Sequence, residues 1–366
     1  MKSKIPVAEP SIGDAELNLV IEAVRSGWVS SKGRFIEEFE EKFAKYIGVR
    51  YGIATSNGTT ALHLALTALG IKQGDEVIIP TLTFVAVANA VIYTGAKPIL
   101  IDSHPDYWCI DLSKIEERIT KKTKAIIPVH LYGHPCDMTK IAGNHNLYVI
   151  EDCAEAHGAK YKDKKVGCFG DIACFSFYGN KIITTGEGGM CLTNREELAE
   201  KMRVLRDHGM DPNRKYWHEV IGFNYRMTNL QAALGVAQIE KIDEFMKRKR
   251  KIARTYNSLL KDIKGITLPP EMPWAKNVYW LYSILVDEKE FGISRDKLMI
   301  NLAENGVETR RFFYPIHTMP PYKKYADDDF HVAERLSSCG INLPSGIKLT
   351  KEEIEDIAQL ILNAIA

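Results

Sequence analysis

The sequence predicts an α/β protein with two domains: a large domain built on a mostly parallel sheet and a smaller α+β domain after it. In the first 240 residues, short apolar runs bounded by turn residues alternate with helical patterns. This alternation is typical of a parallel sheet with helices on both faces. After residue 240 a long helical pattern precedes fewer strand-like runs. We therefore expect a large domain over residues 1–240 and a small domain over residues 241–366.

The expected elements of the large domain follow capping and turn signals along the chain. The first helix is expected at 14–27, with Asp14 as the capping residue and Gly27 at its end. A short helix is expected between the last two strands. Further helices are expected at 35–48, 59–70 and 84–95, and strands at 51–55, 76–80, 97–102, 124–133 and 147–153.

The expected elements of the small domain begin with one long helix over 228–263. At about 1.5 Å per residue, such a helix is long enough to bridge two domains. Strands are expected at 278–286 and near 307–315, and helices at 294–306 and 350–366.

Composition and charge narrow the function classes. The formal net charge is +1, so no bulk positive field favours a nucleic acid or an anionic membrane. No apolar stretch approaches the roughly 20 residues that a membrane span needs, and the lysines near the amino terminus precede no apolar run, so we expect a cytoplasmic protein without a signal peptide. The seven cysteines include no Cys-x-x-Cys pair, so we expect reduced thiols and no metal site.

Two candidate binding positions follow early strands. In "ATSNGTTALHLAL" a turn leads into a helix at Gly58, Thr59 and Thr60, where free N–H groups and hydroxyls can bind an anion. A plain helix cap is the alternative interpretation. In "TLTFVAVANA", Phe84 starts a helix and could stack on a flat ring, although an aromatic in this context is often core.

Two candidate chemical groups follow later strands. "LYVIEDCAEAHGA" delivers Asp152 to the end of an apolar strand, where functional acids of α/β folds lie, with Glu155 three residues on. "CFSFYGNKIITTGEGG" places Lys181 between a strand-like run and a glycine-rich turn. Desolvation can lower the pKa of a lysine from about 10.4 and make it a nucleophile. A solvated carboxylate and a surface lysine are the alternatives.

Together these four pieces match one cofactor. Pyridoxal phosphate has a phosphate for the helix start, a flat ring for Phe84, a ring nitrogen that needs an anion such as Asp152, and an aldehyde that condenses with a lysine such as Lys181. An ion pair with the carboxylate keeps the ring nitrogen protonated, which makes the ring a stronger electron sink.

The motif set resembles the nucleotide-sugar aminotransferases of the DegT/StrS type, which have the aspartate-aminotransferase fold. The motifs "SNGTTALHLAL", "PTLTFVAVANAV", "EDCAEAHGA", "FSFYGNKIITTGEGG" and "GFNYRMTNLQAALG" carry the resemblance over nearly the whole chain. The resemblance implies that Lys181 forms the Schiff base with the cofactor and that Ser176 joins Thr59 and Thr60 at the phosphate. It implies that Asn224 reaches the phosphate of a neighbouring subunit, which makes a homodimer or a higher homo-oligomer with a shared active site. Glu155 stands where many relatives have glutamine, so its hydrogen-bond partner or its protonation is open.

The resemblance also implies the reaction and its substrates. An amino group passes from L-glutamate to a nucleotide-linked 4-keto sugar in two half-reactions. The motifs "SSKG", "VHLYGHPCDM", "YWHEVIGFNYRMTN" and "ETRRFFYPIHTMPPY" resemble most the members that aminate GDP-4-keto-6-deoxy-D-mannose at C4 and form GDP-perosamine, a sugar of bacterial polysaccharides. Candidate residues for the sugar nucleotide share polar groups that suit diphosphate and hydroxyls; they are Ser31, Lys32, Arg310, Tyr314 and His317. A solvated arginine and a structural histidine are the alternatives.

Three other functions compete with this one. A UDP- or dTDP-linked 4-keto-6-deoxyhexose would keep the chemistry and change the nucleotide. A regulator with the same fold and no turnover is disfavoured because Lys181, Asp152 and the phosphate residues are all present. A dinucleotide-dependent oxidoreductase is disfavoured because no Gly-x-Gly-x-x-Gly follows the first expected strand.

Overall fold

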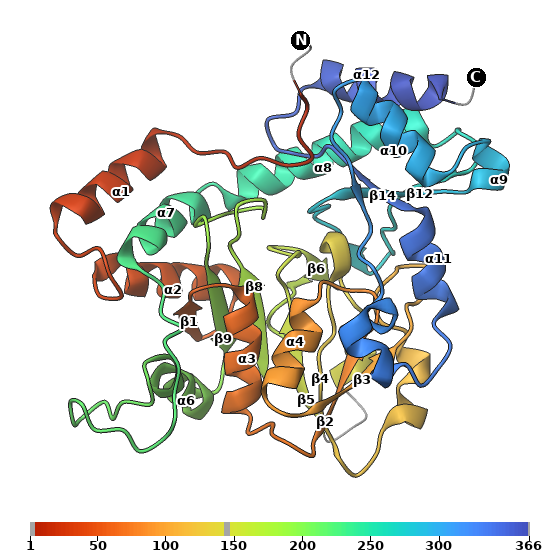
Figure 1. Ribbon diagram of the computed structural model, residues 1–366. Helices are drawn as coiled ribbons and strands as arrows, with labels where there is room; N and C mark the ends of the chain where they lie inside the picture. The colour runs from red at the N-terminus through yellow and green to blue at the C-terminus, as the bar shows by residue number, and fades with distance from the viewer. Residues whose placement is uncertain (1–3, 143–146, 365–366) are drawn as a thin grey trace.

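The computed structural model describes residues 4–142 and 147–364, and its centre is a seven-stranded sheet (Figure 1). The strand order is β1-β9-β8-β5-β4-β2-β3, and every neighbouring pair is parallel except the two pairs that β9 forms with β1 and β8. The predicted mostly parallel sheet is therefore confirmed. Its strands are β1 (Tyr51–Thr55), β2 (Glu76–Pro80), β3 (Lys97–Ile101), β4 (Thr123–Ile126), β5 (Tyr148–Asp152), β8 (Ile172–Ser176) and β9 (Gly189–Thr193).

These strands form where short apolar runs become buried on both faces. Ile53, Ile78, Ile150 and Phe175 are fully buried, as expected for a parallel sheet that helices cover. Figure 1 shows α3 and α4 across one face of the sheet, and α1, α2 and α7 to one side of it. The helices of this part are α1 (Asp14–Arg25), α2 (Arg34–Ile47), α3 (Gly58–Ala68), α4 (Ala86–Tyr93), α5 (Met138–Ala142), α6 (Glu196–Arg206) and α7 (Asn229–Ile239).

Short elements complete this part of the chain. A three-stranded sheet has the order β11-β6-β7 and joins a hairpin after β5 to a strand from beyond residue 270. Its strands are β6 (Lys160–Tyr161), β7 (Lys164–Lys165) and β11 (Ala275–Lys276), and the 3-10 turns are η1 (Leu112–Lys114), η2 (Glu116–Arg118) and η3 (Leu131–Gly133).

The C-terminal part contains a four-stranded antiparallel sheet of order β10-β12-β14-β13. It has its own apolar core, which includes Tyr256, Tyr282 and Ile357. Phe312 and Leu336, which also follow residue 240, belong to the core of the large sheet instead. The domain boundary at residue 240 therefore stays a prediction. The elements are α8 (Ile242–Leu260), β10 (Ile266–Thr267), β12 (Tyr282–Val286), α9 (Glu288–Phe291), α10 (Arg295–Glu304), β13 (Arg310–Arg311), η4 (Ile316–Thr318), η5 (Pro320–Tyr325), α11 (His331–Cys339), β14 (Gly340–Leu343) and α12 (Lys351–Asn363).

Two sequence-based expectations were wrong at helix ends. Gly13, not Asp14, is the N-cap of α1, because the Glu16 carboxylate turns back and accepts the Gly13 N–H at 2.9 Å. The single helix expected over 228–263 is two helices, α7 and α8. They separate at a tight turn in which the Lys241 N–H donates to the Gln238 carbonyl at 3.1 Å. The side chains of Gln238 and Lys241 both donate to Glu16, which fixes this turn.

The last expected helix, over 350–366, is α12, and residues 365–366 lie outside the described residues. Within the described ranges, every helix is too short or too polar to cross a membrane.

Candidate active site

The four predicted pieces of the site meet at one edge of the large sheet. The carboxyl ends of β1, β2, β5 and β8 lead to Gly58, Phe84, Asp152 and Ser176, respectively, and the chain after β8 carries Lys181. In parallel sheets the carboxyl ends of the strands form the usual ligand-binding edge. The fold therefore brings together residues that are more than 100 positions apart in the sequence.

The start of α3 is a capped helix end with backbone N–H groups at its tip. The Asn57 side chain accepts the Thr60 N–H at 2.9 Å, and the Thr60 hydroxyl donates to the Asn57 carbonyl at 2.8 Å. Thr60 thus takes part in the cap, as the alternative interpretation expected. Among the described contacts, this cap leaves the N–H groups of Gly58 and Thr59 for another acceptor. A Cβ atom on Gly58 would lie 2.8 Å from the Ser176 Cβ, so Ser176 stands directly beside this helix start.

An aromatic row lines the same edge. Phe84 is 54% exposed, although it is apolar, and its ring centroid lies 5.7 Å from that of Phe313. Phe313 stacks on Tyr132 at 5.4 Å, and Tyr132 stacks on Trp280 at 6.3 Å. An exposed aromatic beside this row is available to a flat ligand ring, so the core alternative for Phe84 is not what the structure shows.

Lys181 is the basic group at the other end of this row. Its side chain is only 10% exposed, and its Nζ lies 3.6 Å from the centroid of the Trp280 ring and 4.0 Å from Glu155 Oε1. Burial lowers the pKa of Lys181, the Glu155 and Asp152 carboxylates oppose this, and the charge of Arg310 lowers it further. A lysine in this environment gives up its proton more easily than a solvated one, which suits a nucleophile or a general base.

Two buried carboxyl groups face this lysine. Burial raises the pKa of Asp152, while a hydrogen bond from the Ala154 N–H at 3.0 Å and the Lys181 charge favour its ionised form. Glu155 Oε2 accepts the Tyr132 N–H at 2.7 Å. Burial raises the pKa of Glu155 to about 7, although the Lys181 charge works in the other direction. The sequence left the partner of Glu155 open. In the structure Glu155 has two partners, the backbone N–H of Tyr132 and the ammonium of Lys181.

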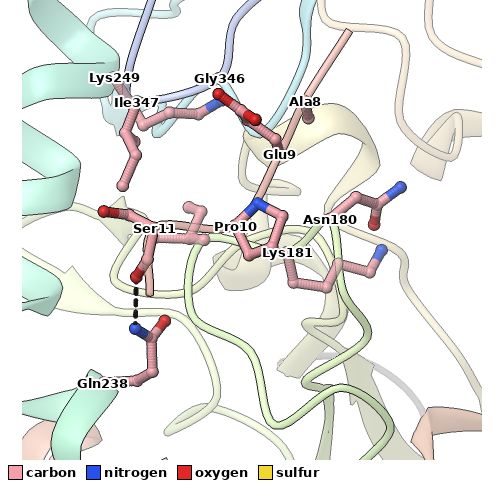
Figure 2. Close-up of a pocket in the computed structure, with 11 residues that line it drawn as sticks. Ala8, Glu9, Pro10, Ser11, Asn180, Lys181, Gln238, Lys249, Gly346 and Ile347 are labelled. Carbon is pink, nitrogen blue, oxygen red and sulfur yellow. Dashed lines mark hydrogen bonds between the residues drawn. The ribbon is translucent and has the colours of Figure 1, made fainter. Parts of the chain in front are cut away.

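The segment that carries Lys181 is held from behind by the N-terminal arm, residues 8–11. Figure 2 shows this arm passing beside Asn180 and Lys181. The Gln238 side chain donates to the Ser11 carbonyl at 2.9 Å and accepts the Thr184 N–H at 3.3 Å. Gln238 thus ties the arm and the lysine segment to α7.

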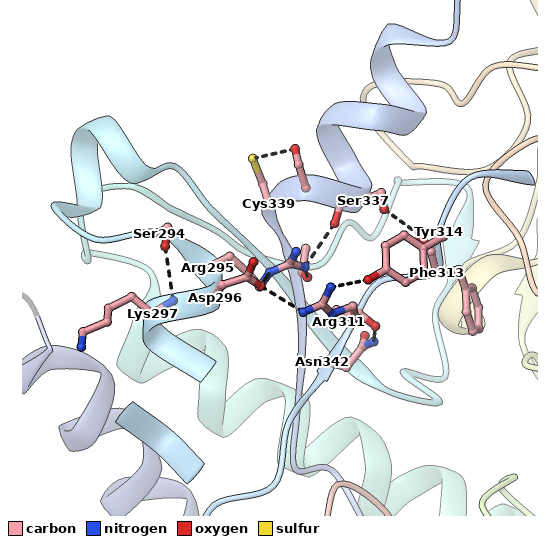
Figure 3. Close-up of polar contacts among 12 residues, drawn as sticks. Ser294, Arg295, Asp296, Lys297, Arg311, Phe313, Tyr314, Ser337, Cys339 and Asn342 are labelled. Atoms are coloured by element: carbon pink, nitrogen blue, oxygen red, sulfur yellow. Dashed lines mark hydrogen bonds and ion pairs between the residues drawn. The ribbon is translucent and has the colours of Figure 1, made fainter. Parts of the chain in front are cut away.

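Two of the candidate substrate residues, Arg310 and Tyr314, lie on or just after β13. Arg310 is partly exposed, forms an ion pair with Glu308 at 3.8 Å, and is close enough for its charge to act on Lys181. The Tyr314 hydroxyl accepts a hydrogen bond from Arg311, whose guanidinium lies 3.5 Å from Asp296 (Figure 3). Both side chains remain open to a ligand.

His317 differs from these two residues because its partners are internal. Its Nδ1 lies 2.7 Å from the Thr81 hydroxyl and its Nε2 lies 3.1 Å from Glu334. The ring is buried and stacks on Phe330 at 4.4 Å. Both ring nitrogens of His317 thus have partners within the chain, as the alternative interpretation expected.

None of the described contacts joins the remaining candidates to Lys181 in the single chain. Ser31 and Lys32 line a separate hollow with Arg203. The exposed Asn224 accepts a hydrogen bond from Arg226 Nε at 2.9 Å. Among the described residues, their contacts are therefore with groups other than Lys181.

The sequence interpretation missed Trp280, Tyr132 and Phe313. Each lies in an apolar run that predicts a strand, and nothing in the local pattern separates such an aromatic from core. Tyr132 has a positive φ of 52°, which places its N–H toward Glu155, but φ is not visible in a sequence.

A buried cluster next to the site has the composition of a metal site. The side chains of His130, Glu151 and Cys153 offer ligand atoms within 4.8 Å of one another. Their hydrogen bonds give another explanation. Glu151 accepts the N–H groups of Gly167 and Phe169 at 2.7 and 2.6 Å, and His130 Nδ1 accepts the Cys136 N–H at 2.9 Å. Glu151 and His130 thus already have hydrogen-bond partners within the chain, which explains their burial without a metal ion.

Comparison with known proteins gives the class. The profile of the DegT/DnrJ/EryC1/StrS aminotransferase family matches residues 10–362, and the chain belongs to this family. The GDP-perosamine synthase of Escherichia coli O157:H7 is 50% identical over 361 residues, covering 98% of this chain and 97% of the relative. The GDP-perosamine synthase of Caulobacter vibrioides is 49% identical over 358 residues, covering 97% and 96%.

A solved structure agrees with these relatives. The putative sugar aminotransferase Spr1654 from Streptococcus pneumoniae, in its PLP form, superposes with a TM-score of 0.92 at 27% identity, covering 99% of this chain and 98% of the other. The protein is therefore a sugar aminotransferase with the fold of this class, and it depends on pyridoxal phosphate.

Proposed function

We propose that the protein transfers an amino group from L-glutamate to C4 of GDP-4-keto-6-deoxy-D-mannose and forms GDP-perosamine. The observation that carries this proposal is a buried lysine, Lys181, between two carboxyl groups, at a sheet edge that also presents an anion site and an exposed aromatic ring. The GDP-sugar is supported by the two GDP-perosamine synthases that share about half of their residues with this chain. A UDP- or dTDP-linked 4-keto sugar is the alternative substrate.

The residues at the site fit pyridoxal phosphate in each of its parts. The N–H groups of Gly58 and Thr59, with the hydroxyl of Ser176, would hold the phosphate. Phe84 would cover the ring, and Asp152 would pair with the ring nitrogen. When bound, the cofactor supplies an aldehyde for the amino group and an electron sink that lets the substrate carbon lose its proton.

Lys181 is the residue that moves protons in this proposal. Burial lowers the pKa of Lys181, so its Nζ is more easily available as a neutral amine. In this form Nζ can take a proton from the substrate carbon that carries the amino group and later give that proton back. The carboxylates of Glu155 and Asp152 stabilise the ammonium while it holds this proton. The same groups act in both half-reactions, with glutamate as the donor and the keto sugar as the acceptor.

We assign the two partly exposed residues of the β13 segment to the sugar nucleotide. Arg310 carries a guanidinium close to Lys181, which suits a phosphate or a carboxylate of either substrate. Tyr314 offers a hydroxyl that Arg311 already orients. We assign His317 a structural role, because Thr81 and Glu334 use both of its ring nitrogens.

We also propose a homodimer in which each active site is shared. Two segments on one side of the chain expose apolar side chains that a stable monomer would bury. The exposed side chains of α1 and the following turn are Leu17, Ile21, Val24 and Trp28, and those before Asn224 are Tyr216, Trp217, Val220 and Ile221. Among the described contacts, none joins Ser31, Lys32 or Asn224 to Lys181 of their own chain, which supports their use by a partner.

Turnover assays with defined substrates test the reaction. We expect amino transfer from L-glutamate to GDP-4-keto-6-deoxy-D-mannose, and loss of turnover in Lys181→Ala. Faster turnover with a UDP- or dTDP-linked keto sugar would move the function to the alternative. Normal turnover in Lys181→Ala would contradict the role of this lysine.

Mixed dimers test the shared site. Co-expression of Lys181→Ala and Asn224→Asp chains with different tags gives a dimer whose one site combines an intact Lys181 with an intact Asn224 from the partner. We expect this heterodimer to be active while both parent homodimers are strongly impaired. A heterodimer no more active than its parents would show that Asn224 acts within its own chain.

A further inference from the structure

The indole ring of Trp280 is fixed in place from several directions. Trp280 is 4% exposed and lies just before β12. Its Nε1–H donates to the carbonyl of Asn180, the residue before the lysine, at 2.9 Å. Its own carbonyl accepts the buried Lys249 ammonium at 2.7 Å. The ring therefore has one defined orientation relative to the lysine segment.

This fixed ring faces the amino group of Lys181. The Nζ lies 3.6 Å from the ring centroid, which is close for a cation over an aromatic face. On another side the Nζ is 4.0 Å from Glu155 Oε1. The Lys181 side chain is only 10% exposed, so both contacts are largely shielded from solvent. The face of an indole and a carboxylate are both groups that favour an ammonium over a neutral amine.

Tyr132 couples these two neighbours of Lys181. Its backbone N–H holds Glu155, and its ring stacks on Trp280 with an interplanar angle of 20°. The next residue, Gly133, has a positive φ of 103°, and a Cβ there would lie 3.0 Å from the Trp280 backbone nitrogen. The loop of Tyr132 therefore packs directly against the segment of Trp280 and connects the indole with the Glu155 carboxylate.

We propose that the Trp280 ring, with Glu155, is the resting place of the Lys181 ammonium whenever this lysine is not bonded to the cofactor. In this position the indole face would stabilise the Lys181 Nζ while it holds the proton that it moves. Trp280 is thus a positioning residue for the proton carrier. The inference rests on the proposed role of Lys181 and adds to it a residue that neither the sequence motifs nor the proposed cofactor contacts include.

Other groups around Lys181 also influence its titration. Asp152 and Glu155 lie on the side of β5, and Arg310 acts from β13. His157 faces the lysine as well, but burial lowers its pKa to about 3, so this imidazole stays neutral. Comparison of variants that leave these four groups unchanged isolates the contribution of the indole.

The test measures the titration of Lys181 in the full-length protein after removal of the cofactor. An amine-specific acylating reagent is applied over a range of pH, and the modification of the peptide that carries Lys181 is quantified by mass spectrometry. Trp280→Leu removes the aromatic face, and Trp280→Phe keeps a face but loses the Nε1–H. Trp274→Leu is the matched control, because Trp274 packs against Tyr107 and Tyr161 instead of Lys181.

We expect the modification midpoint to fall by about one pH unit in Trp280→Leu, by less in Trp280→Phe, and not at all in Trp274→Leu. An unchanged midpoint in a folded Trp280→Leu protein, or an equal shift in the Trp274→Leu control, would overturn the inference.

A second measurement needs no variant of Trp280. Reductive methylation with carbon-13 labels lysine side chains, and Lys181→Arg identifies the Lys181 signal by its absence. Because the Nζ lies over the indole, we expect this signal to be displaced by the ring current. A Lys181 signal at the position of solvated lysines would contradict the contact even if Trp280→Leu does not fold.

The outcome is independent of the proposed reaction. A shift of the Lys181 midpoint in a protein that takes up no pyridoxal phosphate would keep the contact and reject the proposed function. Uptake of pyridoxal phosphate and normal turnover, with an unchanged Lys181 midpoint in Trp280→Leu, would keep the proposed function and reject the role of Trp280.

Discussion

The substitution Glu155→Gln gives the most specific prediction about the site. Glu155 is 4% exposed, accepts the Tyr132 N–H through Oε2, and has a pKa that burial raises from its ordinary value of 4.5 to about 7. A glutamine has nearly the same shape, and its amide oxygen can accept the same N–H. The substitution therefore removes the ionisation of this group and keeps its hydrogen bond.

The pH dependence follows from the direction of this pKa change. Below about pH 4.5 the carboxyl is protonated in both the folded and the unfolded chain, and it does not affect stability. As the pH rises from about 4.5 to about 7, the unfolded chain releases this proton while burial keeps the folded protein protonated, so stability is lost. Above about pH 7 the carboxyl is ionised in both states and the loss levels off. A rise in pKa from 4.5 to about 7 corresponds to about 3 kcal/mol of the free energy of unfolding. The value of about 7 already contains the effect of the Lys181 charge, which lowers the Glu155 pKa and so acts against burial.

The assay is urea unfolding of the cofactor-free protein, followed by tryptophan fluorescence, at several values between about pH 5 and pH 8. Relative to the parent protein, we expect Glu155→Gln to gain about 3 kcal/mol in the free energy of unfolding across this range. Glu200→Gln, an exposed carboxyl on α6, is the control and should show no trend. A difference for Glu155→Gln that stays flat or falls with rising pH would refute the reasoning.

Three further predictions follow from the site and its supports. In Glu16→Gln the trend should be reversed, because burial, which would raise the Glu16 pKa, is outweighed by hydrogen bonds from Lys241 and Gln238, which lower it below its ordinary value of 4.5. The variant should be less stable than the parent above about pH 4.5, and urea unfolding should show this difference shrinking as the pH falls below that value. Gly58→Ala should weaken binding of pyridoxal phosphate by about tenfold or more in a fluorescence titration, because its Cβ would lie 2.8 Å from Ser176; unchanged affinity would show that the helix start does not bind the phosphate. Asp152→Asn should lower kcat by about 100-fold or more while the protein still binds the cofactor, since the amide has no charge to pair with the ring nitrogen; a small loss would contradict that pairing.

Much of the fold could be predicted because local patterns determine it. The short apolar runs at β1, β2, β3 and β5 are buried strands, and the turn and cap residues before α3 place its start within one residue of the expectation. The helix break at Lys241 could not be predicted, because the chain there has good helix formers. The break depends on Glu16, which is 225 residues away in the sequence.

The same distinction holds for the site. Lys181, Asp152 and Phe84 follow strands, so the rule that ligands bind at the carboxyl ends of parallel strands indicated them. Trp280 and Tyr132 could not be identified, because their roles come from contacts with Lys181 and Glu155 across the sheet edge. The open question about Glu155 also needed the fold, since burial is the largest cause of its raised pKa and burial is not visible in the sequence.

The central claim is that Lys181 and its surrounding groups use pyridoxal phosphate to move an amino group from glutamate to a GDP-linked keto sugar. An absorbance spectrum of the purified protein with pyridoxal phosphate tests it most directly, recorded before and after L-glutamate and again after GDP-4-keto-6-deoxy-D-mannose. We expect a visible band of the bound cofactor that shifts to that of pyridoxamine phosphate with glutamate and returns with the sugar. A band that glutamate leaves unchanged, or that the GDP-sugar does not restore, would contradict the claim.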